Sequence, residues 1–283
     1  MRLESIHTGN FKLDGGAMFG VVPKSIWNRI NPADENNMCN WAMRCLLVED
    51  GNRLILIDNG IGDKQSEKFF GYYFLNGDNS LQKSLQAAGV DYSDITDVVL
   101  THLHFDHCGG SISYNSSKSR FDPTFPNAVY WSHKKHWQHA LNPNPRERAS
   151  FLTDNIVPIQ ESGQLKFIGE DLKISENIDV ILANGHTEMM MCPRIQFKDQ
   201  TLIFCADMIP SAGHIPPHYV MAYDIRPLES MRESHAFLQE AVERNYTLFF
   251  EHDLHLECGT VQQTERGFKL NNSLSLSEFT SVP

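Results

Sequence analysis

The sequence predicts an α/β fold, because short β-rich segments and amphipathic helical segments recur in both halves of the chain. An apolar, strand-like segment also runs directly into a cluster of histidines, an arrangement typical of α/β proteins whose sites follow strand ends. No linker-like change of composition separates the halves. We therefore expect a single domain over residues 1–283, although length alone would also allow two small domains.

The first half begins with antiparallel strands. The segments RCLLVE (44–49) and RLILID (53–58) flank DGN (50–52), a pattern that predicts a β-hairpin. The stretch SLQKSLQAAG (80–89) begins at a capping serine, ends at a glycine and places Leu81, Leu85 and Ala88 on one face. This pattern predicts a helix.

Further strands and helices follow. The strand DVVL (97–100) leads into THLHFDHCGG, and residues 111–145 form a Ser-, Asn- and Pro-rich excursion with a strand and a helix of its own. The helix is expected at 132–140, after a strand at 126–131. The remaining predicted elements are strands at 179–183, 201–205 and 247–250 and a helix at 228–243.

Composition excludes several classes of function. The chain has 24 basic and 35 acidic residues, and a net charge of −11 disfavours nucleic-acid binding. No segment is apolar enough to span a membrane, and the first residues lack a signal-peptide core, so we expect a cytoplasmic protein. Six scattered cysteines without a CxxC pair are interpreted as reduced thiols.

The densest chemical signal follows the strand at 97–100. An H-x-H-x-D-H pattern there carries four metal-capable side chains on one short loop, namely His102, His104, Asp106 and His107. Imidazole and carboxylate groups suit Zn²⁺, Fe²⁺ or Mn²⁺, and a catalytic site leaves one coordination position open. A structural zinc site would more often use cysteines. The pattern therefore predicts a catalytic metal site.

Three further candidate ligands each come just after an apolar, strand-like segment. They are His186 after VILANG, Asp207 after LIFCA and His252 after LFFE. Ligand sites gather at the carboxyl ends of strands, so residues delivered by four separate strand ends indicate a shared metal centre. His255 is a weaker rival of His252.

The other histidines lack this context. Two of them, His214 and His218 in AGHIPPHYV, either line the pocket or have a structural role. Cys108 and Cys205 lie beside predicted ligands and are interpreted as small buried hydrophobic residues. Four more histidines are interpreted as ordinary solvated or helix-face residues, namely His133, His136, His139 and His235.

The motifs HLHFDH, NGHT, FCADM and FFEHD, in this order, resemble the successive metal motifs of the metallo-β-lactamase superfamily over nearly the whole chain. The resemblance implies an αββα sandwich that holds two divalent metal ions, with zinc favoured and iron, manganese or cobalt also suited. It assigns His102, His104 and His186 to the first metal, Asp106, His107 and His252 to the second, and Asp207 to both.

The resemblance also implies supporting roles. Asp58 matches a position that holds the metal loop by hydrogen bonding, and Thr101 and Thr187 are expected to orient ligands in a similar way. Two metals about 3.5–4 Å apart lower the pKa of a shared water towards about 7, so hydroxide attacks the substrate without a protein nucleophile. Asp106 is expected to relay the proton to the leaving group.

The segments at 209–227 and FFGYYF (69–74) resemble pocket-forming elements of the branch with N-acyl homoserine lactonases and methyl parathion hydrolase. The implied activity is hydrolysis of a small lactone or other ester, with phosphotriesters as promiscuous substrates. Tyr223 in MAYD is expected to assist at the substrate oxygen, with a packed, structural tyrosine as the alternative. FFGYYF itself suits a core or dimer contact better than a substrate groove.

Other classes of function stay open. A mononuclear-iron oxidoreductase, such as a persulfide dioxygenase, or a glyoxalase-type thioesterase would keep a similar motif with fewer ligands used. A non-catalytic metal-binding member is disfavoured by the complete set of ligands. An exported β-lactamase and an RNA-processing enzyme fit the chain less well, and aromatic segments outside the metal motifs are compatible with a homodimer.

Overall fold

The computed structural model describes residues 1–115, 117 and 119–281, which divide into two compact units. Each unit is built around its own mixed β-sheet. Whether the whole chain acts as one domain stays a prediction. The first unit comprises Met1–Gly9 and Met43–Glu176, and the second comprises Asn10–Ala42 and Asn177–Pro283.

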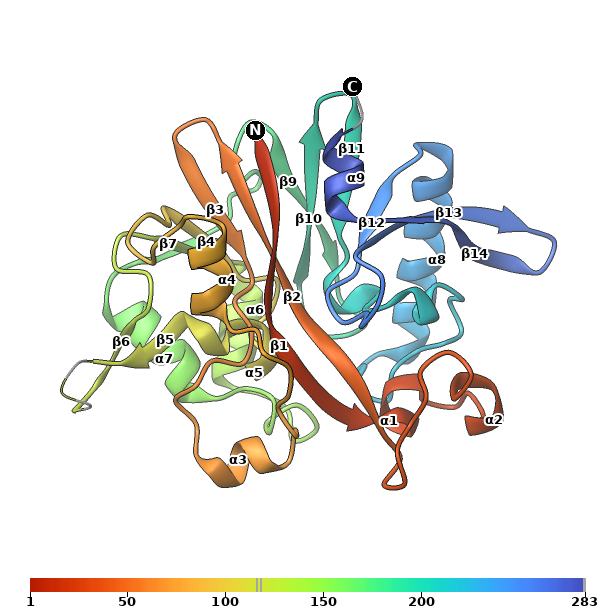
Figure 1. Cartoon of the computed structure of the whole chain (residues 1–283), viewed down its shortest axis with the longest axis horizontal. Helices are drawn as coiled ribbons and strands as arrows, with labels where there is room; N and C mark the ends of the chain where they lie inside the picture. The colour runs from red at the N-terminus through yellow and green to blue at the C-terminus, as the bar shows by residue number, and fades with distance from the viewer. Residues whose placement is uncertain (116, 118, 282–283) are drawn as a thin grey trace. The chain divides into compact units, whose positions relative to one another are not determined.

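The first sheet has the strand order β1-β2-β3-β4-β7-β8 and belongs to the first unit except for the end of β1 after Gly9 and the start of β2 before Met43. Strands β2 and β3 are antiparallel, whereas β3, β4, β7 and β8 run parallel to one another. Strands β1 and β2 are long and lie side by side (Figure 1). The strands are β1 (Arg2–Asp14), β2 (Met38–Asp50), β3 (Arg53–Ile57), β4 (Asp97–Val99), β7 (Val129–Ser132) and β8 (Leu165–Phe167).

The predicted hairpin at 44–58 is confirmed by the register of β2 and β3. Asp50 pairs with Arg53, so Gly51 and Asn52 form a two-residue turn. Gly51 has a φ of 65°, a value that glycine adopts without the steric cost of a Cβ. The hairpin therefore fixes which faces of β2 and β3 are buried.

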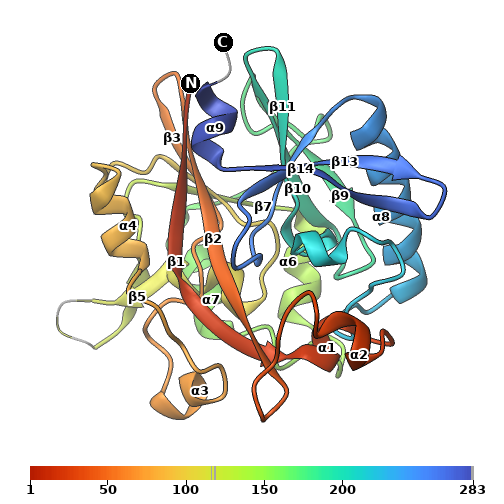
Figure 2. The same ribbon diagram turned by 45° about the vertical axis from the view of Figure 1, so that its right-hand side comes forward.

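The predicted helix at 80–89 is confirmed as α4 (Leu81–Ala87). The Ser80 hydroxyl accepts a hydrogen bond from the Lys83 N–H (3.3 Å), and Gly89 follows the helix with a φ of 75°. The Ser84 hydroxyl donates to the His7 carbonyl at 2.6 Å and thereby joins α4 to β1 (Figure 2). The cap at Ser80 thus fixes where this helix begins, and the contact of Ser84 with His7 fixes its position beside β1.

The excursion at 111–145 contains a small antiparallel hairpin, followed by a strand of the main sheet and then a helix. The strand predicted at 126–131 begins three residues later, as β7, and the helix predicted at 132–140 is α6. The elements in and next to this stretch are η1 (Gly109–Ser111), β5 (Ile112–Tyr114), β6 (Phe121–Pro123) and α6 (Lys134–Leu141). The other helices of the first unit are α3 (Glu67–Gly71), α5 (Phe105–Cys108) and α7 (Thr153–Glu161). The core of this unit contains the large buried rings of Phe125, Tyr130 and Trp137.

The sheet of the second unit has the order β14-β13-β12-β11-β10-β9. Strands β11 and β12 are parallel, and the other neighbours are antiparallel. The strands predicted at 179–183, 201–205 and 247–250 are confirmed as β9, β11 and β12. The strands are β9 (Ile178–Ala183), β10 (Met190–Phe197), β11 (Gln200–Phe204), β12 (Thr247–Phe249), β13 (Cys258–Thr264) and β14 (Gly267–Leu274).

Helix α8 (Pro227–Glu243) confirms the helix predicted at 228–243 and is seen beside the sheet of its own unit in Figure 1. It begins with a proline at a position where the missing N–H costs nothing. Its buried residues Phe237, Leu238 and Ala241 belong to the core of this unit. The other helices are α1 (Gly15–Phe19), α2 (Lys24–Trp27), η2 (Ala206–Met208), η3 (Ala212–His214) and α9 (Leu276–Ser281).

Two wider expectations can be compared with the fold. None of the helices in the described ranges is long and apolar enough to cross a membrane. The six cysteines are free thiols, as predicted, and all of them are buried. Burial raises the pKa of the Cys108 thiol to about 12, so this residue is an uncharged, packed side chain beside the metal loop.

Candidate metal centre

The four candidate ligands of the H-x-H-x-D-H motif lie in the first unit, just after β4. All four side chains are buried. The ring of His102 lies 4.6 Å from that of His104 and 3.9 Å from that of His107, measured between centroids. His107 Nε2 is 3.6 Å from an oxygen of Asp106. The loop therefore brings four ligand side chains together within one unit.

Asp58 holds this loop through contacts with Thr101 and His107. It follows β3, is fully buried and accepts hydrogen bonds from the Thr101 N–H (2.8 Å) and the Thr101 hydroxyl (2.6 Å). Its Oδ2 is also 3.1 Å from His107 Nδ1. A carboxylate at Nδ1 leaves Nε2 as the metal-binding nitrogen and orients the ring. The contacts expected of Asp58 and Thr101 are therefore present, while the buried Thr187 keeps its role as a prediction.

The glycines that end the motif allow the loop to lie directly on the segment after β3. A Cβ on Gly110 would come within 2.3 Å of the Asn59 carbonyl oxygen, and one on Gly109 within 2.1 Å of the Ile61 carbonyl oxygen. Any larger residue would push the loop away from Asp58. The sequence HCGG is thus explained by packing as well as by ligation.

The interpretation of His136 as an ordinary solvated or helix-face residue is wrong. His136 is fully buried, and its Nε2 accepts a hydrogen bond from the Leu103 N–H at 2.9 Å. Leu103 lies between two candidate ligands, so His136 holds the backbone of the metal loop. Helix periodicity did not identify this role, because the sequence does not show which segment α6 packs against. In the structure His136 and Trp137 are among the buried residues of α6.

Glu147 is a buried carboxylate that the sequence did not single out. One of its oxygens lies 2.7 Å from His139 Nε2, and the other lies 3.6 Å from His104 Nε2. His139 is therefore a half-buried partner of this carboxylate on the face of α6. The contact places another negative charge beside a candidate metal ligand.

The three later candidate ligands lie together in the second unit. Asp207 is central, with Oδ2 at 3.1 Å from His186 Nε2 and Oδ1 at 3.2 Å from His252 Nε2. All three residues are buried. The strands β4, β9, β11 and β12 each end three residues before a candidate ligand. A common rule, one ligand just past each strand end, therefore delivers ligands in both units.

Outer contacts orient these ligands as well. His186 Nδ1 lies 2.9 Å from Asp224 Oδ1, and His252 Nδ1 lies 2.7 Å from the Ala42 carbonyl oxygen. Each histidine therefore directs Nε2 towards Asp207. Asp224 was not predicted, although it ends the MAYD segment that the sequence analysis had noted.

The carboxylates around His186 favour a positive charge. Burial lowers the pKa of His186, but Asp207 and Asp224 more than offset this effect and raise the pKa to about 10. The same field would favour a bound cation. Imidazole nitrogens, buried carboxylates and oriented rings together fit divalent metal ions in both units.

The remaining candidates have distinct environments. Tyr223 is 38% exposed and precedes Asp224 in the chain. His214 is buried and lies between the Ser211 hydroxyl (2.8 Å) and the Met18 carbonyl oxygen (2.9 Å), which favours the structural reading. His255 is exposed, whereas His252 contacts Asp207, so the weaker rival is not supported.

A family model described as the metallo-beta-lactamase superfamily matches residues 44–252, a range that contains the candidate ligands of both units. This match defines the class of protein as an α/β protein with the metallo-β-lactamase fold. The chain belongs to the metallo-β-lactamase superfamily, and the predicted fold class and family are confirmed.

Solved structures share this fold over nearly the whole chain. A probable metal-dependent hydrolase from Staphylococcus aureus is 26% identical, with a TM-score of 0.87 and coverage of 96% of each chain. AidC, a dizinc quorum-quenching lactonase in complex with a product, is 21% identical with a TM-score of 0.79 and coverage of 98% and 97%. The hydrolase AbOPH is 19% identical with a TM-score of 0.75 and coverage of 95% and 92%.

Proposed function

We propose that the chain is a dinuclear metal-dependent hydrolase, and that it hydrolyses a lactone or another carboxylic ester. The observation that carries this proposal is the completeness of the ligand set. Each unit presents oriented, buried ligands, and the family match spans both groups. The proposed ligands are His102, His104, Asp106, His107, His186, Asp207 and His252.

The proposed chemistry needs little from the protein beyond ligation and proton transfer. Two divalent ions, with zinc favoured, would supply a hydroxide at neutral pH and polarise the substrate oxygen. Asp106 would accept the proton and pass it to the leaving group. Tyr223 would donate a hydrogen bond to the substrate oxygen from its partly exposed position beside Asp224.

The proposed substrate class rests on the structures that share the fold. They include AidC, which is a lactonase, and an N-acyl homoserine lactone hydrolase solved with a product at its metal centre. The MAYD segment resembles the same branch. A lactone or aryl ester is therefore the first substrate to test, with phosphotriesters as slower ones.

The first experiment is elemental analysis of protein purified without added metal, combined with an assay on lactones, aryl esters and phosphotriesters. We expect about two equivalents of metal, as in two-metal hydrolytic sites, and turnover of a lactone or ester. One equivalent of iron without hydrolysis would overturn the proposal in favour of an oxygenase. Metal-loaded protein that turns over none of these compounds would overturn the proposed substrate class.

The role of Tyr223 is tested separately. Tyr223→Phe should keep the full metal content and lower kcat by about tenfold, the effect of losing roughly 1.4 kcal/mol of transition-state stabilisation. An unchanged kcat would contradict the catalytic role and support a packing role. The same measurement on Tyr114→Phe, an exposed tyrosine on β5, gives the matched control.

A further inference from the structure

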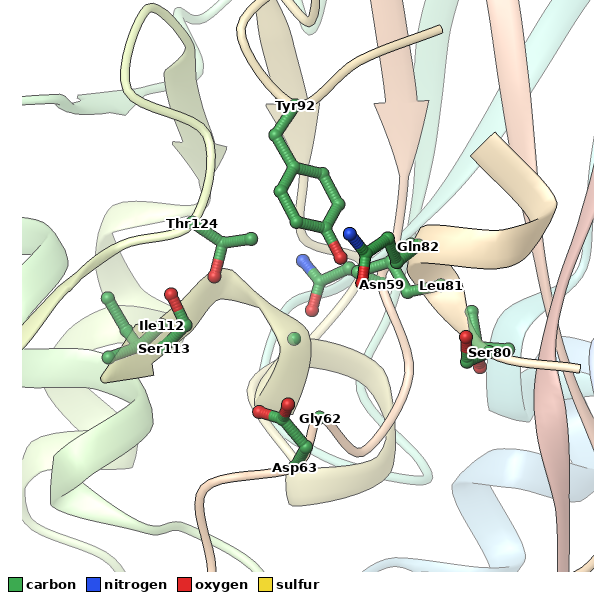
Figure 3. A pocket seen from close by; sticks show the side chains of 12 residues that line it. Asn59, Gly62, Asp63, Ser80, Leu81, Gln82, Tyr92, Ile112, Ser113 and Thr124 are labelled. Atoms are coloured by element: carbon green, nitrogen blue, oxygen red, sulfur yellow. The ribbon is translucent and has the colours of Figure 1, made fainter. Parts of the chain in front are cut away.

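The first unit contains a cavity of about 220 Å³ that none of the predicted metal ligands lines. It is enclosed by residues of α4, β5 and the segment that follows β3 (Figure 3). Its volume is below the roughly 300–1,000 Å³ of pockets for drug-sized ligands, but far above the space that one water needs. The cavity therefore suits a small organic molecule.

Two buried polar atoms in the wall have no hydrogen-bond partner among the described residues, namely Asn59 Oδ1 and Thr124 Oγ1. Asn59 is fully buried, and Thr124 is 8% exposed. The Asn59 amide nitrogen donates to the Ser111 hydroxyl at 2.8 Å, which fixes its side chain and leaves the oxygen for another donor. Burying a polar group without a hydrogen-bond partner is unfavourable, so such groups point to an occupant.

The lining indicates the chemistry of that occupant. Thr124 and Ser113 offer hydroxyl groups, Gln82 offers an amide, and Figure 3 shows the Tyr92 hydroxyl near Gln82 and Asn59. Burial, with a smaller effect of Asp63, raises the pKa of Tyr92 to about 12, so its hydroxyl remains a donor. Groups that both donate and accept hydrogen bonds are matched best by hydroxyl groups of a ligand.

The charge and the apolar surface of the cavity lining narrow the chemical class of the ligand further. No lining residue within the described part of the chain is cationic, and Asp63 is acidic. An anionic ligand would therefore be repelled and left without a counter-charge. Leu81, Ile112 and the ring of Tyr92 add apolar surface for C–H groups of a ligand.

We propose that this cavity binds a small neutral polyol of about monosaccharide size, with hydrogen bonds to Asn59 and Thr124. The Asn59 N–H donates to the His107 carbonyl oxygen at 2.9 Å, and Asn59 follows Asp58, the carboxylate that holds the metal loop. The occupant would therefore contact the residue next to Asp58. The inference does not rest on the proposed hydrolase function, because the cavity and its lining lie within the first unit.

The test is isothermal titration of the metal-loaded full chain with myo-inositol and with D-glucose. Thr124→Val removes the hydroxyl at nearly constant volume, and Gln82→Trp places a bulky indole on a residue of α4 that lines the cavity. We expect saturable binding of at least one probe, about tenfold weaker in Thr124→Val, the effect of losing roughly 1.4 kcal/mol. Gln82→Trp should abolish binding.

The matched control is Gln86→Trp, which adds the same indole to an exposed position of α4 outside the cavity lining. It should bind the probe as the wild type does. Thr124→Val should unfold at the wild-type temperature or above, because it removes an unpaired buried hydroxyl. D-glucose 6-phosphate should bind more weakly than D-glucose.

Three results would overturn the proposal. The first is the absence of saturable binding of both probes to the wild type up to their solubility, which would mean that the cavity holds water only. The second is unchanged binding in Thr124→Val and Gln82→Trp, which would place the probe elsewhere. The third is tighter binding of D-glucose 6-phosphate than of D-glucose, which would indicate an anion site.

Discussion

The two units deliver their candidate ligands in different ways. In the first unit, one loop after β4 carries four ligands and depends on outside support from Asp58 and His136. In the second unit, three strand ends each carry one ligand. Parallel pairing of β11 and β12 places Phe204 opposite Phe249, three residues before Asp207 and His252. Loop ligands thus rely on hydrogen bonds that hold their loop, whereas sheet register places the strand-end ligands, whose rings outer contacts also orient.

The largest expected effect comes from removing a ligand of either kind. Asp207→Ala deletes the carboxylate that contacts both His186 and His252, whereas His104→Ala leaves three other ligands in its loop. We expect both variants to lose more than about 100-fold in metal affinity, since even outer partners of ligands contribute about 10–100-fold. Asp207→Ala should lose more. Metal content after gel filtration, with His235→Ala as control, measures this.

Retention of both metals by Asp207→Ala would contradict its central place among the strand-end ligands. Equal losses in His235→Ala would contradict the assignment of specific ligands altogether, because His235 is exposed on α8.

The ion pairs made by two of the ligand-carrying strands, β4 and β9, differ as well. Arg53 and Asp97 join β3 to β4, with the Asp97 side chain 7% exposed, whereas Arg194 and Asp179 join β10 to β9 with both side chains about one-third exposed. Arg53→Met should lower the free energy of unfolding by about 3 kcal/mol, because it removes the cation that pairs with a buried carboxylate. Arg194→Met should cost less than about 1 kcal/mol. Urea denaturation at pH 7 compares them.

The pH dependence sharpens this comparison. Burial raises the pKa of Asp97, but hydrogen bonds from Arg53, Thr96 and Trp131 outweigh it and leave the pKa lowered. The stabilisation is therefore present above about pH 4, the pKa of an unfolded aspartate, and is lost as the pH falls through the lower folded value. The stability difference between wild type and Arg53→Met should shrink in that acidic range. A constant difference would argue against the carboxylate as its source.

Supporting carboxylates provide the next test. Asp58 accepts three contacts from Thr101 and His107, and Asp224 contacts His186. Asp58→Asn and Asp224→Asn should each weaken metal binding by about 10–100-fold, with Asp58→Asn nearer the upper value. Competition with a chromogenic chelator measures both. A larger loss in Asp224→Asn would reverse the view that loop ligands depend more on outside support.

The smallest expected effect concerns two histidines that the sequence had grouped together. His136→Ala leaves the Leu103 N–H without its acceptor and should cost about 1–3 kcal/mol in unfolding free energy. His235→Ala removes an exposed side chain and should stay within about 0.5 kcal/mol. Thermal unfolding of the two variants compares them directly. Equal stability would mean that His136 does not hold the loop.

The sequence predicted those parts that depend on local patterns. The H-x-H-x-D-H motif, the hairpin at β2 and β3 and the capped helix α4 each have signals within a few residues. Strands β10, β13 and β14 were not predicted, because β10 contains a proline and β13 and β14 are largely polar, so their strand structure shows only in the pairing with their neighbours. Asp224 and Glu147 were missed because the candidate ligands that they contact, His186 and His104, are distant in the sequence.

The burial of all six thiols has a consequence for studying the motions of this protein. Burial raises the pKa of Cys39 to about 11 and that of Cys108 to about 12, so reactive thiolate is scarce near neutral pH. An alkylating reagent would then react only when the surrounding structure opens. Cys108 lies in the first unit and Cys205 in the second. Alkylation rates at these two residues, followed by mass spectrometry, would time the opening of each unit separately without any added label.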